Sequence, residues 1–273
     1  MSTLTASPAA ASSPPQASPL VLRVIGACAL AHLINDLIQA VLPSIYPMLK
    51  ANYGLSFTQV GMITLTFQLT ASLLQPWIGY HTDRHPKPWL LPAGMVCTLV
   101  GILLLAFVGS FPAILLAAGL VGVGSSTFHP ETSRVARLAS GGRYGLAQST
   151  FQVGGNTGSA FGPLLAAAII IPYGQDHIAW FGLFAVFAIG VLYGLSRWYR
   201  NHLNLFKLKQ GSQATHGLSK GRVTFALVVL AVLVFSKYFY MSSLTSYFTF
   251  YLIEKVQLSV ANSQLYLFLF LGA

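Results

Sequence analysis

The sequence predicts an all-α membrane protein, and two observations lead to that fold class. Charged residues make up 7% of the 273 residues and hydrophobic residues 55%, whereas about one quarter of an ordinary soluble domain is charged. Apolar stretches near the length of about 20 residues that a helix needs to cross a bilayer recur along the whole chain. Most of this protein is therefore expected to be surrounded by lipid.

The lengths and flanking charges of the apolar stretches predict seven complete membrane spans. The last residues, 265–273, are also rich in Leu and Phe and end while still apolar, so we interpret them as part of an eighth span. The seven complete spans are 20–49, 57–80, 89–108, 111–128 with a polar extension, 145–171, 178–198 and 223–253.

The composition between the spans predicts the domain organisation. Residues 1–19 are rich in Ser, Pro and Ala and contain no charge, so they are expected to be a disordered tail and not a secretory signal. Residues 199–222 are polar and basic, which predicts a linker between a six-helix bundle at 20–198 and the beginning of a second bundle at 223–273. Two six-helix repeats are a common plan for secondary transporters.

The positions of the charges predict the orientation. The connections on one side of the predicted membrane contain only Lys50 and Lys255, and by the positive-inside tendency the opposite side and the N-terminus are cytoplasmic. A bacterial inner membrane is the expected location. Membrane topology thus explains the net charge of +10, and no nucleic-acid partner is needed. The basic residues on the predicted cytoplasmic side include Arg23, Arg84, Lys87, Arg134, Arg137, Arg143, Arg197, Arg200, Lys207, Lys209, Lys220 and Arg222.

The loop at 79–89 reads Gly-Tyr-His-Thr-Asp-Arg-His-Pro-Lys-Pro-Trp and resembles the loop signature of the major facilitator superfamily. In that family the Asp holds the cytoplasmic gate against helix ends and basic groups. The resemblance implies a major facilitator fold, and gate roles for Gly79, Asp83, Arg84 and Lys87. Pro86 replaces the usual glycine, which changes the expected turn. A solvated loop whose charges only set the topology is the alternative.

The fifth span contains a second motif, Gly-Ser-Ala-Phe-Gly-Pro at 158–163, which resembles the Gly-rich motif of antiporters in the same superfamily. Gly158, Gly162 and Pro163 match it, whereas Ala166 and Ala167 stand where glycines are more usual. Close helix packing explains small residues equally well. With the loop signature, the motif favours an exporter over an importer.

Three further stretches, 32–36, 129–163 and 235–240, resemble the fosmidomycin resistance branch of the superfamily. That resemblance implies a twelve-helix, proton-coupled exporter of fosmidomycin, a small anionic phosphonate, of which this chain would contain the first two thirds. The protein is expected to be a monomer. No cofactor is implied. Ala118 stands where many antiporters place an intramembrane arginine, so a proton relay must use other residues.

Asp36 is the principal candidate for proton coupling. A carboxylate deep within an apolar span costs about 2.5–3.5 kcal/mol on insertion scales, and His32 lies one helical turn before it on the same face, with Asn35 beside them. A partly desolvated carboxyl group there can alternate between protonated and charged forms. A carboxylate held permanently by a partner is the alternative.

Lys237 is the second intramembrane charge and lies at a similar depth to Asp36, about 20 Å from the cytoplasmic start of its span. It is predicted to attract an anionic substrate or to pair with Asp36 between transport steps. Competition between that pairing, protonation of Asp36 and substrate binding would couple proton entry to drug exit. Tyr238 and Tyr240 follow it and offer hydroxyl donors.

Polar residues in two other spans complete the candidate site. Gln148, Gln152 and Asn156 recur every four residues and predict a polar stripe that binds substrate, or else bonds to another helix. His129 and Glu131 are candidates for proton transfer. An ion pair between Glu131 and Arg134, three residues later, is the alternative role for that acid.

Rival functions remain open at this stage. His32, Asp36, His129 and Glu131 are acceptable metal ligands, but their spacing matches no recognised motif, so no metal is assigned and a membrane-embedded metalloenzyme is only a remote alternative. An importer or exchanger of another small solute is a second alternative. A structural fragment that acts with a partner is the third.

Overall fold

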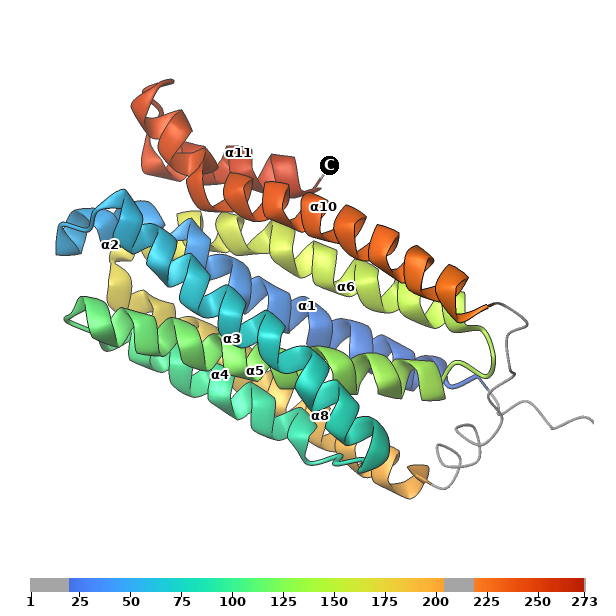
Figure 1. The fold of residues 1–273 in the computed structure, drawn as a ribbon. Helices are drawn as coiled ribbons and strands as arrows, with labels where there is room; N and C mark the ends of the chain where they lie inside the picture. The colour runs from blue at the N-terminus through green and yellow to red at the C-terminus, as the bar shows by residue number, and fades with distance from the viewer. Residues whose placement is uncertain (1–19, 204–218, 273) are drawn as a thin grey trace, which may run out of the picture.

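The computed structural model of the chain describes residues 20–203 and 219–272, and all regular elements within these ranges are helices (Figure 1). The predicted tail at 1–19 and most of the predicted linker lie outside the described residues, so the domain division stays a prediction. The elements are α1 (Leu22–Ser44), α2 (Tyr46–Tyr53), α3 (Phe57–Arg84), α4 (Leu90–Phe107), α5 (Phe111–Leu138), α6 (Tyr144–Leu165), the π-helix η1 (Ala166–Ile170), α7 (Ile171–Tyr173), the 3₁₀-helix η2 (Gln175–Trp180), α8 (Phe181–Asn201), α10 (Lys220–Glu254) and α11 (Val260–Gly272).

Seven helical segments of the described chain are long and apolar enough to cross a membrane, which confirms the predicted fold class. The first predicted span is not one continuous helix. It consists of α1 and α2, which are separated at Ile45. Pro43 lies just before this interruption and Pro47 in the first turn of α2, where proline is well tolerated because the first turn leaves its backbone N–H groups unpaired.

Local capping residues determine where several helices begin and end. The Ser56 hydroxyl accepts a hydrogen bond from the Gln59 backbone N–H, and the Gln59 side chain accepts one from the Ser56 N–H, which is a capping box that starts α3. Gly54 ends α2 with a φ of 60°, and Gly141 and Gly142 turn the chain from α5 into α6 with φ of 58° and 92°. Glycine adopts such angles without steric cost.

The helix that contains the Gly-rich motif packs closely on α1. A Cβ atom at Gly154 would collide with the Ala29 carbonyl group, and one at Gly158 would collide with the Leu33 carbonyl oxygen. The two backbones therefore approach closely only because these positions have no side chain. Close packing is thus an observed role of this motif, and three residues after Pro163 the helix changes to the π-helix η1.

Gly158→Ala is expected to destabilise the protein by about 1–3 kcal/mol, because the added methyl group forces α6 away from α1. The matched control is Gly190→Ala on α8, where a Cβ would meet nothing within 4 Å and alanine is the better helix former. Thermal unfolding in detergent measures both variants. Equal melting temperatures for the two would contradict the close-packing explanation.

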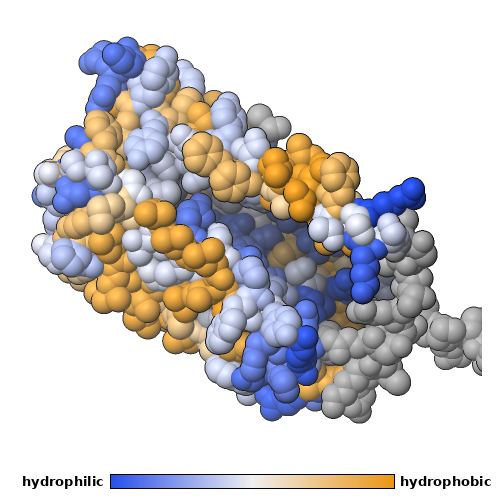
Figure 2. All heavy atoms as spheres, viewed as in Figure 1, coloured by the Kyte–Doolittle hydropathy of each residue, from blue (hydrophilic) through white to orange (hydrophobic). Residues whose placement is uncertain are grey.

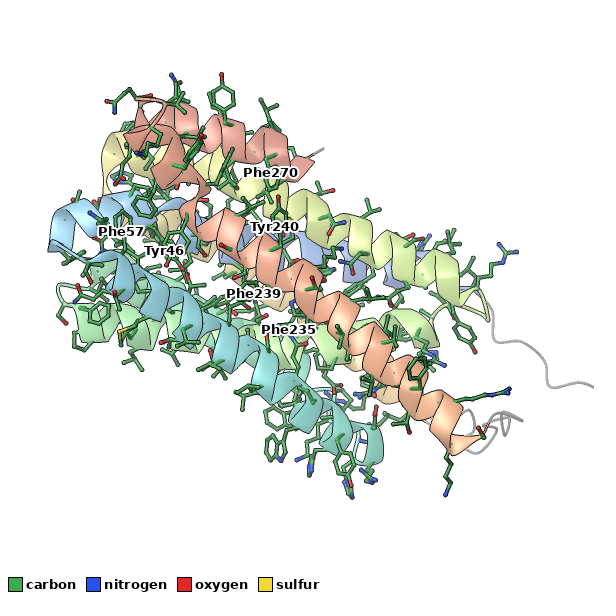
Figure 3. All side chains as sticks on the ribbon, turned by 45° about the horizontal axis from the view of Figure 1, so that its top comes forward. Tyr46, Phe57, Phe235, Phe239, Tyr240 and Phe270 are labelled. Carbon is green, nitrogen blue, oxygen red and sulfur yellow. The ribbon has the colours of Figure 1, made fainter. Side chains whose placement is uncertain are left out.

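The end of the bundle where α3 and α5 finish and α6 begins contains Arg84, Lys87, Arg137 and Arg143. We call it the basic end. At the opposite end α10 is joined to the other helices. The Tyr46 hydroxyl lies 2.9 Å from the Thr64 hydroxyl, which lies 3.2 Å from the Ser246 hydroxyl. Figure 3 shows Tyr46 and Phe57 near this end, and Phe235, Phe239 and Tyr240 along α10.

A second contact at the same end joins α11 to α1. The Gln264 side chain is fully buried and donates a hydrogen bond of 2.7 Å to the Ser44 carbonyl oxygen. By contrast, residues 220–240 of α10 are all exposed, and Figure 2 shows a hollow with hydrophilic residues on its floor. The described chain is therefore closed at the end opposite the basic end and open along the first part of α10.

Candidate functional site

Three side chains from α1 and α5 form the acid–imidazole cluster, defined as His32, Asp36 and His129. One Asp36 carboxylate oxygen lies 3.2 Å from His32 Nε2, and the other lies 3.8 Å from His129 Nε2. The Asn35 amide donates a hydrogen bond of 3.0 Å to the same oxygen that faces His129. The His32 side chain is 3% exposed and that of Asp36 is 19% exposed, so the acid is the part of this pair that solvent can reach.

Aromatic rings and a glycine shape the surroundings of His32. Its imidazole stacks on the Phe151 ring with centroids 4.0 Å apart, and the Phe128 centroid lies 5.9 Å away. A Cβ at Gly155 would collide with the His32 ring and approach the Asp36 carboxylate. Glycine at this position therefore lets α6 pass directly over the cluster.

The hydrogen bonds of His32 require a proton between it and Asp36. His32 Nδ1 lies 2.8 Å from the Phe151 carbonyl oxygen, and because a carbonyl oxygen only accepts, Nδ1 must bear a hydrogen. In a neutral imidazole the other nitrogen then has a lone pair, and this lone pair would face the Asp36 oxygen at 3.2 Å. A hydrogen bond there needs either a protonated Asp36 or a doubly protonated His32.

The same cluster has a geometry that a metal ion could use. One ligand atom from each of His32, Asp36 and His129 lies within 4.8 Å of the others, and two imidazoles with a carboxylate suit several transition metals. Glu131, the fourth sequence candidate, is not in this group, and its carboxylate is paired with Arg134. The candidate metal ligands are thus reduced from four residues to three.

The predicted polar stripe of α6 is exposed along its length, at Gln148, Gln152 and Asn156. The Gln152 amide donates a hydrogen bond of 3.4 Å to Asn156, and the Ser133 hydroxyl of α5 donates one of 3.2 Å to Gln148. Asn156 directly follows Gly155, so the stripe begins beside the acid–imidazole cluster and runs toward the basic end. It remains available to a solute.

The candidates on α10 lie on its exposed first part. Tyr238 is 59% exposed and Tyr240 is 63% exposed, and the Lys237 ammonium lies 5.6 Å from the centroid of the Tyr238 ring. Within the described chain, the ion-pair partners of Asp36 are His32 and His129. The anticipated pairing of Lys237 with Asp36 is therefore not formed in this arrangement, because this part of α10 stands away from α1.

A second charged group, the basic-end network, consists of Thr82, Asp83, Glu131 and Arg134. Arg134 donates hydrogen bonds to Glu131 and to Asp83 at 2.5 Å each, and to the Thr82 hydroxyl at 3.0 Å. It thereby joins the end of α3 to α5. The Glu131 side chain is completely buried, so the ion pair that was the alternative role for this residue is present.

The other gate candidates lie around this network. The Gly79 carbonyl oxygen is 3.4 Å from Arg134 Nη2. The Arg84 guanidinium lies over the Tyr80 ring at 3.6 Å, and the Lys87 carbonyl oxygen accepts the Leu90 N–H at the start of α4. Sequence reasoning did not identify Arg134 as the partner of Asp83. The position of Arg134 one turn after Glu131 indicated a pairing with that acid. Its contact with Asp83 on α3 depends on the tertiary fold and could not be predicted from spacing.

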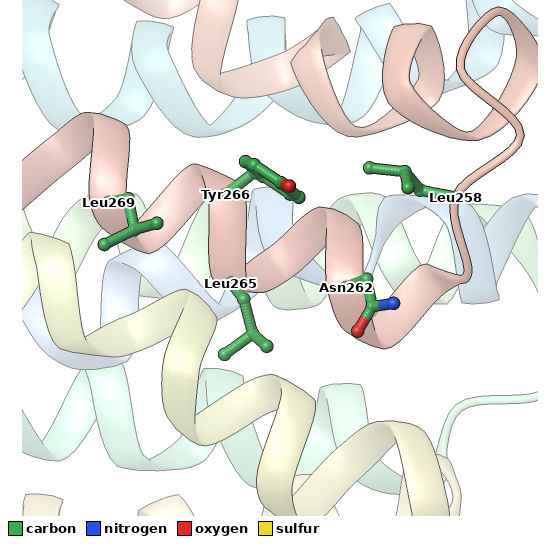
Figure 4. A pocket seen from close by; sticks show the side chains of 5 residues that line it. All are labelled: Leu258, Asn262, Leu265, Tyr266 and Leu269. Atoms are coloured by element: carbon green, nitrogen blue, oxygen red, sulfur yellow. The ribbon is translucent and has the colours of Figure 1, made fainter.

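A surface pocket on α11 is unrelated to these residues (Figure 4). Its volume is about 360 Å³, and Leu258, Leu265 and Leu269 supply most of its side chains with Asn262 and Tyr266. None of the predicted site residues lines it. Its largely apolar lining, on a helix that would face lipid or another helix, does not suit a small anion.

Comparison with known proteins gives concordant matches. Residues 28–273 match the family model described as Major Facilitator Superfamily. The chain is 58% identical over 250 residues to the fosmidomycin resistance protein of Escherichia coli (strain K12), covering 92% of this chain and 62% of that protein. It is 40% identical over 254 residues to the uncharacterized MFS-type transporter YfnC of Bacillus subtilis (strain 168), covering 92% of this chain and 61% of that protein.

The fold also matches solved structures. A bacterial homologue of the human lysosomal transporter Spinster, in an inward-facing and occupied conformation, superposes with a TM-score of 0.68 at 16% identity, covering 91% of this chain and 57% of that one. The chain thus spans about three fifths of the length of the curated relatives that it matches.

Proposed function

This chain belongs to the major facilitator superfamily, and from that membership we propose that it is part of a proton-coupled exporter of a small anionic phosphonate such as fosmidomycin. It is a multi-pass membrane transporter chain and not an enzyme. The proposed location is the bacterial inner membrane, with the N-terminus and the basic end in the cytoplasm. A monomer that works by alternating access is the proposed form.

The observation that carries the proton coupling is the hydrogen bonding of His32. Its Nδ1 faces a carbonyl oxygen and its Nε2 faces Asp36, so the pair needs a proton that a neutral imidazole and a carboxylate do not have. Asp36 and His129 are partly exposed, which gives this proton a route to water. Such a pair can bind a proton in one conformation and release it in another.

The substrate is proposed to bind between α6 and the exposed part of α10. Lys237 supplies a positive charge for the phosphonate, Tyr238 and Tyr240 supply hydroxyl donors, and Gln148, Gln152 and Asn156 bind the polar remainder, with Asn35 at the edge of the cluster. The exposure of these α6 and α10 residues supports this assignment. An ammonium group is a point charge suited to an anion that must later leave.

Coupling follows when α10 closes over the cavity. A bound anion would draw Lys237 and α10 inward, and the approach of the ammonium group to Asp36 favours release of the proton from the acid–imidazole cluster. Substrate and proton thus occupy the site in turn, which is the requirement for exchange. Glu131 is proposed as a second proton site, reached when the basic-end network opens.

Gate and packing roles complete the proposal. Gly79, Asp83, Arg84 and Lys87 hold the cytoplasmic gate, with Arg134 as the residue through which Asp83 acts. Gly158, Gly162 and Pro163 form the antiporter-like segment that lets α6 move against α1. The close approach of the two backbones at Gly158 and Gly162 supports the packing role of this segment.

An importer or exchanger of another small polar solute is the second candidate within the family. His32, Asp36 and His129 could instead hold a metal ion within the transporter. About one bound zinc or iron per chain, in protein purified without added metal, would favour this over the proton-coupling role of the cluster.

Fosmidomycin accumulation in energised bacterial cells tests the proposed function. Cells that express the full-length protein are expected to accumulate less drug than control cells, and a proton uncoupler should abolish the difference.

Lys237→Met is expected to weaken substrate affinity about tenfold, because a charge-assisted hydrogen bond is lost. Lys255→Met, an exposed lysine at the other end of α10, is the control. Unchanged accumulation with well-expressed protein would exclude fosmidomycin as the substrate.

A further inference from the structure

Two polar ladders run side by side from the acid–imidazole cluster to the basic end. On α5, His129, Ser133 and Arg137 follow one another at intervals of four residues and therefore share a face. On α6, Asn156, Gln152 and Gln148 do the same in the opposite chain direction. The hydrogen bond from Ser133 to Gln148 joins the two ladders. Together the two ladders form what we call the polar track, and eight residues of helix give it a length of about 12 Å.

The track ends in a pocket at the basic end, lined by Arg137, Tyr144 and Gln148 with a volume of about 280 Å³. Arg137 is exposed and its guanidinium lies 5.0 Å from the centroid of the Tyr144 ring. Within the described chain it takes part in no ion pair, unlike Arg134 one turn earlier. Its charge is therefore available, and the ring restricts where the guanidinium can lie.

We propose that Arg137, Tyr144 and Gln148 form a capture site for a small phosphonate or phosphate anion, which then moves along the polar track to the acid–imidazole cluster. A guanidinium binds such groups with two parallel hydrogen bonds. The neutral amides beyond it solvate the anion without holding it, so that passage toward Asp36 stays reversible. The inference rests on the proposed function for the direction of travel, while the capture site itself can be tested by binding alone.

The experiment is calorimetric titration of the purified full-length protein with methylphosphonate, in nanodiscs of zwitterionic lipid. Arg137→Gln is expected to weaken binding about tenfold, because a charge-assisted contact is lost, and Arg137→Lys should weaken it less. Raising the ionic strength should weaken binding to the wild type more than to Arg137→Gln. Arg200→Gln, an exposed arginine in the last turn of α8, is the control and should bind like the wild type.

The possible outcomes separate failure of the capture site from failure of the proposed function. Equal affinities for wild type and Arg137→Gln would remove it and leave the proposed exporter standing. Affinity that falls when phosphatidylglycerol is added would assign Arg137 to lipid headgroups instead of a free anion. Absence of binding to the wild type would remove the site together with the proposed substrate class. Arg137-dependent binding in a protein that does not export fosmidomycin would keep the site and contradict only the proposed function.

Discussion

Asp36→Asn is expected to lower proton-driven fosmidomycin export by on the order of a hundredfold or more, which is the scale of rate loss when a positioned proton-transfer group is removed. Asparagine has nearly the same shape and can still donate a hydrogen bond to His32 Nε2, so the protein should fold. It cannot release a proton. The measurement is the initial rate of drug export in energised cells with matched expression.

Two controls separate coupling from substrate binding. Asp176→Asn changes an acid of η2 whose side chain is 64% exposed, and it should export like the wild type. Asp36→Asn itself should still exchange labelled for unlabelled fosmidomycin across a vesicle membrane without a proton gradient, because the substrate residues are intact. Export by Asp36→Asn that keeps both its rate and its sensitivity to an uncoupler would show that the acid–imidazole cluster is not the coupling site.

Arg134→Gln is expected to destabilise the protein by about 3–5 kcal/mol, because it leaves the fully buried Glu131 carboxylate without its charged partner. The side chain of Arg134 is itself only 9% exposed. It also connects Asp83 to α5, so the end of α3 should become more mobile. Thermal unfolding in detergent measures the loss, with the exposed Arg197 of α8 replaced by Gln as the control.

A double variant makes this prediction specific. Adding Glu131→Gln to Arg134→Gln removes the unpaired charge, so the double variant should be more stable than the Arg134→Gln single variant. This non-additivity is expected for side chains in direct contact. If the double variant were as unstable as the sum of the two single variants, the buried ion pair would not be the source of the destabilisation.

The membrane spans could be predicted because each helix must present about 20 apolar residues to lipid. Hydropathy did not predict that α3 continues as a helix beyond Tyr80 to Arg84, and it gave a polar extension of the fourth span but not its length, which reaches Leu138 in α5. Their last turns are polar but still form backbone hydrogen bonds, and Arg134 connects the two extensions. Nor did it predict the interruption at Ile45, where the sequence stays apolar on both sides and only the proline positions indicate a break.

The candidate site was predictable where it depends on one helix. The spacing of His32 and Asp36 is one turn, and their contact at 3.2 Å follows from helix geometry. The Phe151 carbonyl and His129 come from other helices, so the proton-requiring geometry could not be derived from spacing. Counting residues along the two helices predicts that Asp36 and Lys237 lie at a similar depth. It does not predict the distance between them, which depends on how far α10 stands from α1.

The central claim is that the His32–Asp36 pair holds a proton that substrate binding releases. The most direct measurement adds fosmidomycin to weakly buffered, detergent-solubilised full-length protein and follows proton release with a pH-sensitive dye, alongside calorimetric binding. The wild type should release a proton as drug binds, because in the proposed exchange drug binding weakens proton binding, an effect that is reciprocal, and Asp36→Asn should bind drug without release. Equal release by both proteins, or binding by the wild type with no release, would contradict the account.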